Sequence, residues 1–167
     1  MTPFTLFHVV LSLVGIGSGL VIMYGMLRAK SMNSGTALFL ATTVLTSLTG
    51  FGLPAHKLMP SHIVGIISLF VLAVAIFSRY ARRLAGGWRP AYVITAAIAL
   101  YLNVVVLIIQ LFEKVPDLKA LAPTQSELPF VVTQVVVMAV FLAVTVLAAK
   151  RFHPEEQRGA AAMAKAA

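Results

Sequence analysis

The chain has 167 residues, of which 60% are hydrophobic and only 11% are charged. Soluble domains are nearer half apolar and a quarter charged, so this composition excludes an ordinary soluble fold. Cysteine is absent, which excludes disulfide scaffolds, thiol redox relays and thiolate metal sites. The net charge of +8 does not predict a nucleic-acid partner, because the basic residues follow a membrane pattern described below.

The charged residues fall in short clusters between uncharged runs of about 20 residues, the length that crosses a hydrocarbon core of roughly 30 Å. This pattern predicts an all-α, polytopic membrane protein, folded as one compact domain over 1–152 with a disordered cytoplasmic tail over 153–167. The amino terminus lacks a basic segment, so no cleavable signal peptide is expected. Five transmembrane helices are predicted, at 6–27, 35–53, 62–78, 91–112 and 130–149.

The first predicted span contains Gly15 and Gly19, which form a G-x-x-x-G pattern. Small residues four positions apart let two helix backbones approach closely. We expect this face to pack within the molecule. The alternatives are a seam between two copies of the chain, or contact with a larger membrane complex in which the protein is a non-catalytic accessory subunit.

The second predicted span is short and rich in hydroxyl groups. Thr42, Thr46 and Thr49 share one face by their spacing. Lipid does not favour such a face, so it should point into the bundle. Most hydroxyls of this kind donate to the carbonyl one turn back along the helix.

The turn between the second and third spans holds His56 and His62, and a third histidine, His8, begins the first span. Imidazole is the usual protein ligand for zinc, copper and haem iron. These three residues are therefore candidate metal or haem ligands, although the spacing of His56 and His62 matches no standard motif.

The fourth and fifth spans carry amides. Asn103 and Gln110 are seven residues apart and share a helix face, and Gln134 lies in the first turns of the fifth span. An amide inside a membrane costs free energy unless it is hydrogen-bonded. These residues predict either bonds between helices or a binding site. The loop between the two spans is the longest, and a short surface helix is expected over 117–122.

Ten of the thirteen basic residues would lie on one side of this five-span arrangement. The other side would hold the remaining three basic residues and three of the five acids. The positive-inside rule makes the basic side cytoplasmic. The amino terminus is therefore expected outside and the carboxyl terminus inside the cell, in a multi-pass inner-membrane protein.

This topology gathers most polar residues in the outer half of the bundle, above an apolar base. It predicts an outward-facing pocket that binds a small amphipathic molecule, such as a quinone or a lipid. Familiar catalytic motifs are missing, so neither a reaction nor a cofactor is assigned. The span cores contain no charged residue and the sequence shows no inverted repeat, so a transporter is not favoured. The predicted lining is Thr49, His62, Asn103, Gln110 and Gln134.

Three segments of the chain, 49–51, 60–65 and 122–127 (TGF, PSHIVG and APTQSE), resemble stretches in small integral membrane proteins of Gram-negative bacteria. The similarity extends to about Arg151. It implies a bacterial inner membrane and carries no activity with it.

Overall fold

The protein is described by a computed structural model that covers residues 2–52 and 60–153, with the backbone alone for 60–62. This part of the chain is all-α and contains no strand, which confirms the predicted all-α class. Its elements are α1 (Pro3–Leu27), α2 (Asn33–Gly50), α3 (Pro60–Ile76), a π-helical turn η1 (Phe77–Ala81), α4 (Trp88–Lys114), α5 (Pro116–Leu121) and α6 (Leu128–Arg151).

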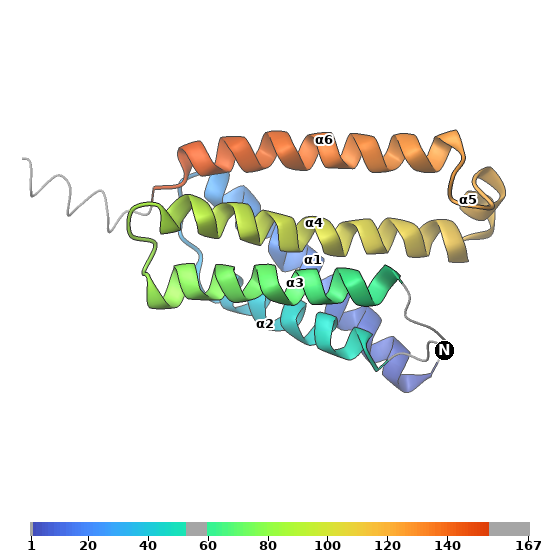
Figure 1. The fold of residues 1–167 in the computed structure, drawn as a ribbon, viewed down its shortest axis with the longest axis horizontal. Helices are drawn as coiled ribbons and strands as arrows, with labels where there is room; N and C mark the ends of the chain where they lie inside the picture. Colours follow the sequence, from blue (N-terminus) through green and yellow to red (C-terminus); the bar gives the residue numbers. More distant parts are fainter. Residues whose placement is uncertain (1, 53–59, 154–167) are drawn as a thin grey trace, which may run out of the picture.

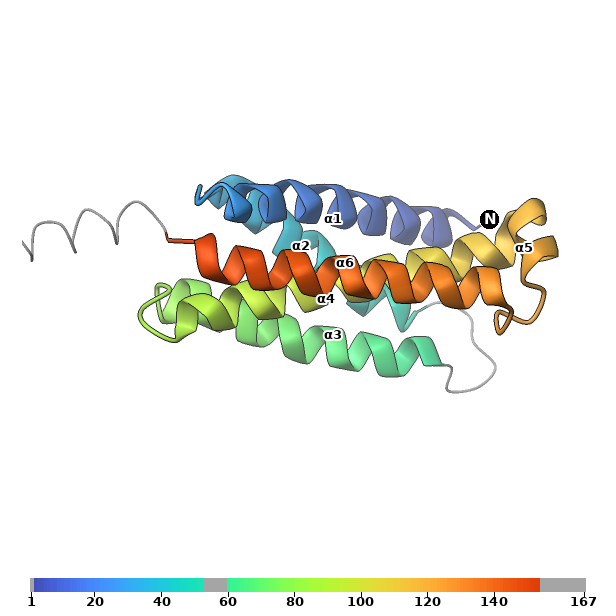
Figure 2. The same cartoon turned by 90° about the horizontal axis from the view of Figure 1, so that it is seen from above.

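The long helices run up and down along one axis, and each is antiparallel to the next (Figure 1). Helix α4 is central, since it contacts α1, α3, α5 and α6. Seen from above, α1 and α3 lie on opposite sides of α4 and α6 (Figure 2). The start of α1 and the end of α6 lie at opposite ends of the bundle (Figure 1).

Helix α4 takes its central place because its inward face is built from small residues. Ala96, Ala97 and Ala99 are almost fully buried, together with Leu100. Alanine brings backbones close where lipid supplies no hydrophobic drive to pack helices together. Around this seam lies the main core, to which α1 contributes Ile22 and the other helices contribute further apolar side chains.

Four helices, α1, α4, α6 and the continuous segment Ile63–Ala81, are long and apolar enough to cross a membrane. Helix α2 is not among them, because threonine and serine dilute its apolar residues. Its 18 residues still measure about 27 Å at 1.5 Å per residue, close to the thickness of a hydrocarbon core.

Helix α2 hides its polar side chains and exposes its apolar ones. Five hydroxyl residues are buried, whereas Leu38, Leu45 and Leu48 are about half exposed. A surface helix in water would show the reverse pattern. The outer surface of α2 is therefore suited to an apolar environment. The buried hydroxyl residues are Thr36, Thr42, Thr43, Thr46 and Ser47.

The helix ends differ by a few residues from the predicted boundaries, for local reasons. Helix α1 begins at Pro3, and the Thr2 hydroxyl accepts a hydrogen bond from the Thr5 amide at 3.2 Å. Proline at the first helical positions costs no hydrogen bond, and a threonine cap satisfies a free amide. The expected surface helix of the long loop is present as α5, which also starts at a proline.

Candidate functional site

The polar residues of α2 and α4 meet where α1 crosses them at Gly15. A β-carbon built on Gly15 would lie 3.2 Å from Thr43 Oγ1, 3.3 Å from Thr42 Oγ1 and 3.6 Å from Asn103 Nδ2. The missing side chain thus lets α1 approach polar groups from two other helices. We call Thr42, Thr43, Thr46 and Asn103 the polar cluster; Thr46 lies one turn beyond Thr42 on the same face of α2.

Only part of the polar cluster is hydrogen-bonded. The Thr42 hydroxyl donates to the Leu38 carbonyl at 2.7 Å, as expected for a threonine inside a helix. Thr43 Oγ1, Thr46 Oγ1 and Asn103 Nδ2 are buried and have no hydrogen-bond partner among the described residues. Each such group costs about 1–3 kcal/mol when it is left unsatisfied.

Gly15 and Gly19 face the interior of the bundle. Both residues are buried, and Gly19 lies against Phe39 of α2 and Leu100 of α4. The small-residue face of α1 is therefore covered by the chain's own helices. It is not a free surface for a second copy or for a larger complex.

His8 and Thr49 join the first half of α1 to the last turn of α2. His8 Nδ1 lies 2.8 Å from Thr49 Oγ1, and the Thr49 hydroxyl donates to the Leu45 carbonyl at 2.7 Å. Since the hydroxyl has one proton, it accepts the bond from His8, which places the imidazole proton on Nδ1. Thr49, a predicted lining residue, already uses its hydroxyl within the protein.

Two more hydroxyl pairs, formed by residues outside the polar cluster, connect helices. Ser47 donates to Ser68 at 3.1 Å and joins α2 to α3. Tyr92 donates to Thr36 at 3.3 Å and joins α4 to the first turn of α2. Sequence reasoning gave Thr43, Thr36 and Ser47 no role, although their spacing of seven and four residues indicated a second inward face of α2.

The glutamines lie apart from the polar cluster. Gln110 is half-buried near the end of α4. Gln134 is half-buried on α6, and its buried Oε1 atom has no partner among the described residues. Because α4 and α6 are antiparallel neighbours, both amides lie toward the end of the bundle that holds α5 (Figure 1).

The predicted histidine site falls largely on residues beyond the described ranges. His56 is outside them, and His62 lies in the first turn of α3 with its side chain outside them. Within the described ranges, no three His, Cys, Asp or Glu side chains are grouped to hold a metal ion. A metal or haem site at His8, His56 and His62 therefore stays a prediction.

Comparison with known proteins finds no matching family model, no matching curated protein and no matching solved structure.

Proposed function

We propose that the protein is a five-span bacterial inner-membrane protein, with its amino terminus outside, that binds a small amphipathic molecule carrying a carbonyl group. Helix α2 supports the fifth span, because it buries its hydroxyls and exposes its leucines. The charges support the orientation. Arg28, Arg79 and Lys150 represent the basic end, while the described acids lie in or beside the long loop at the other end.

The binding proposal rests on one observation, the set of buried donors without partners in the polar cluster. Asn103 Nδ2 offers two N–H groups and no acceptor, and Thr43 and Thr46 each offer one O–H group. A carbonyl oxygen, such as that of a quinone or a lipid ester, accepts such bonds and relieves their desolvation cost. Isolated donors of this kind, buried in an apolar bundle, favour a ligand over a purely structural role.

The surroundings of the polar cluster suit the rest of such a molecule. Phe39 and Leu100 pack against Gly19, and Ile16 is buried next to Gly15, so the side chains around the polar cluster are apolar. Asn103 is residue 16 of the 27 in α4, counted from the basic end, so the donors lie in the outer half of the bundle. Gln134 Oε1, an acceptor without a partner, lies further toward the proposed outer opening.

Native mass spectrometry of the protein released from mild detergent tests this proposal. We expect a discrete organic adduct on the wild-type protein that is lost in Asn103→Leu and Thr43→Val. Thr95→Val is the matched control, because the Thr95 hydroxyl already donates to the Ala91 carbonyl at 2.7 Å. No adduct on the wild-type protein, or an adduct that survives Asn103→Leu, would contradict the proposal.

The thermal stability of the same variants after delipidation separates a ligand site from a structural bond. Asn103→Leu removes an unsatisfied amide, so the stability of the ligand-free fold should stay the same or rise by up to about 3 kcal/mol. Ser47→Ala breaks the bond to Ser68 and should lose about 0.6 kcal/mol, a typical value for a bond between membrane helices. A much larger loss in Asn103→Leu would mean that the amide holds the helices together.

A further inference from the structure

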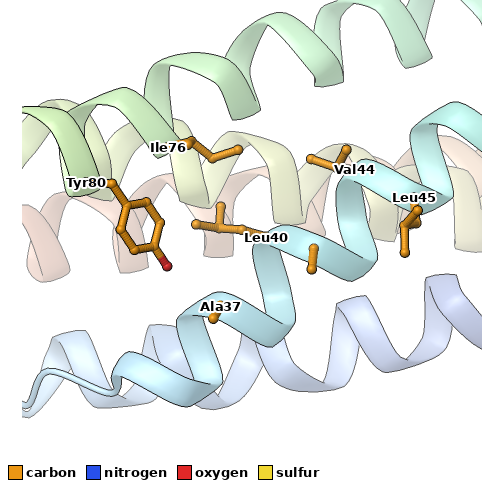
Figure 3. A pocket seen from close by; sticks show the side chains of 7 residues that line it. Ala37, Leu40, Val44, Leu45, Ile76 and Tyr80 are labelled. Atoms are coloured by element: carbon orange, nitrogen blue, oxygen red, sulfur yellow. The ribbon is translucent and has the colours of Figure 1, made fainter.

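An apolar groove lies between α2 and the α3–η1 segment, on the opposite face of α2 from the threonines of the polar cluster. Its volume is about 480 Å³, and its side chains converge from the two helices (Figure 3). On α2 the lining extends over nine residues, from Ala37 to Leu45, or about 12 Å along the helix. The lining residues are Ala37, Leu40, Ala41, Val44, Leu45, Ile76 and Tyr80.

The groove ends at a fixed arginine. Asn33 lies four residues before Ala37, so it continues the groove-lining stripe of α2 toward the basic end. Arg79, next to Tyr80, donates from Nη2 to Asn33 Oδ1 at 2.6 Å and to Ser31 Oγ at 3.3 Å. Its guanidinium carbon also lies 5.2 Å from the centre of the Tyr92 ring. These contacts hold a cation where the apolar lining stops.

Further cations gather at this end, and they have no anionic partners among the described residues. Arg28 lies over the Tyr24 ring and Arg82 over the Trp88 ring, each at 5.3 Å. Asp117 and the other described acids belong to the α4–α6 loop region at the far end of the bundle. The basic end is therefore a region of positive potential next to the apolar groove.

We propose that this groove binds an anionic phospholipid, with one acyl chain along α2 and the phosphate beside Arg79. The apolar lining suits the acyl chain, and the positive charge of Arg79 attracts the negative charge of the headgroup. The Tyr80 hydroxyl at the groove's end suits the polar interface of the membrane. Basic pockets between membrane helices select anionic headgroups in this way. The site is separate from the polar cluster and does not depend on the ligand proposed there.

Lipid titration by native mass spectrometry tests the proposal, with phosphatidylglycerol and phosphatidylcholine of identical acyl chains as probes. The wild-type protein should retain phosphatidylglycerol preferentially. Arg79→Gln should reduce that preference about fivefold, the effect of one basic residue near a membrane surface. Lys150→Gln makes the same charge change on α6 and should leave the preference unchanged. An equal loss of the preference in both variants would mean that the anionic lipid is attracted by net charge alone, and this would overturn the proposal.

A second pair of variants tests the groove without touching Arg79. Ala41→Phe fills the groove and should lower the binding of both lipids. Leu38→Phe adds a ring to the half-exposed, non-lining face of α2 and should not. Unchanged phosphatidylglycerol binding in Ala41→Phe would overturn the proposal. So would a wild-type dimer that Ala41→Phe converts to monomer, since a second copy would then occupy the groove.

Discussion

At the scale of single residues, the hydroxyls and amides of the bundle differ in whether they have a hydrogen-bond partner. Thr42, Thr49 and Thr95 donate to carbonyls of their own helices, so they cost little inside a membrane and need no other partner. Thr43 Oγ1, Thr46 Oγ1 and Asn103 Nδ2 have no hydrogen-bond partner among the described residues. These three atoms, rather than polarity alone, mark the polar cluster as the candidate site.

Glycine at position 19 is required by close packing, and substitution should show it. A β-carbon there would lie 2.5 Å from Leu100 Cδ1 and 2.9 Å from the Phe39 ring, and both side chains are almost fully buried. Gly19→Ala should therefore lower the free energy of unfolding by about 1–3 kcal/mol, the usual cost of overpacking. Thermal unfolding in detergent measures the change.

Gly17→Ala is the matched control, because a β-carbon at Gly17 meets nothing within 4 Å. It should leave the stability unchanged or raise it slightly, since alanine has the higher helix propensity. Equal stability of the two alanine variants would contradict the packing shown at Gly19.

At the scale of elements, the loop before α6 is organised by Glu127. Its carboxylate accepts bonds from the Thr124 hydroxyl at 2.9 Å, the Thr124 amide at 3.1 Å and the Ser126 amide at 3.1 Å. Desolvation acts to raise the pKa of Glu127, but these bonds outweigh it and hold the pKa below its ordinary value of 4.5. The ionised carboxylate thus fixes the start of the last helix.

The lowered pKa predicts a loop that loosens in acid. A carboxyl with a lowered pKa stabilises the folded loop fully above its ordinary pKa, and this contribution disappears as the pH falls through the folded value. Amide hydrogen exchange at Thr124 and Ser126, corrected for intrinsic rates, should accelerate below about pH 4. Glu127→Gln should cause the same acceleration at neutral pH.

Glu113→Gln serves as the control for this prediction, because it makes the same charge change at the far end of α4. It should leave the exchange of the Thr124 and Ser126 amides as slow as in the wild-type protein. Rapid exchange in both variants would mean that net charge, rather than the bonds to Glu127, orders the loop.

At the scale of the whole molecule, the arrangement of α2 decides the topology. The chain has no cysteine, so single-cysteine variants can be labelled with a membrane-impermeant thiol reagent without background. If α2 spans the membrane, Thr2→Cys, Gly52→Cys and Ser126→Cys should react from outside the cell. Ser31→Cys and Ala85→Cys should react only after the membrane is opened.

Reaction of Gly52→Cys on the same side as Ser31→Cys would show that α2 does not cross. The protein would then have four spans and both termini on one side. The exposed leucines of α2 oppose this outcome. A helix lying in water would expose its hydroxyls and bury its leucines, which is the reverse of what α2 does.

The positions of the helices, and the gathering of the basic residues at one end of the bundle, could be predicted from the sequence. The predicted spans 91–112 and 130–149 lie within α4 and α6, and the short helix of the long loop is close to α5. These features depend on local composition. A charge in hydrocarbon is costly wherever the neighbouring helices lie, and prolines such as Pro3 and Pro116 begin helices without tertiary help.

The pairs that build the candidate site could not be predicted. His8 and Thr49 are 41 residues apart, and Ser47 and Ser68 are 21 apart, while Thr43 and Asn103 both approach α1 at Gly15, where a side chain is missing. The rotation of each helix about its axis decides these contacts. Lipid is equally apolar on every side, so a nearly uniform apolar helix contains no signal for its rotation. Only the fit of side chains between packed helices fixes it, and with it the site and the groove.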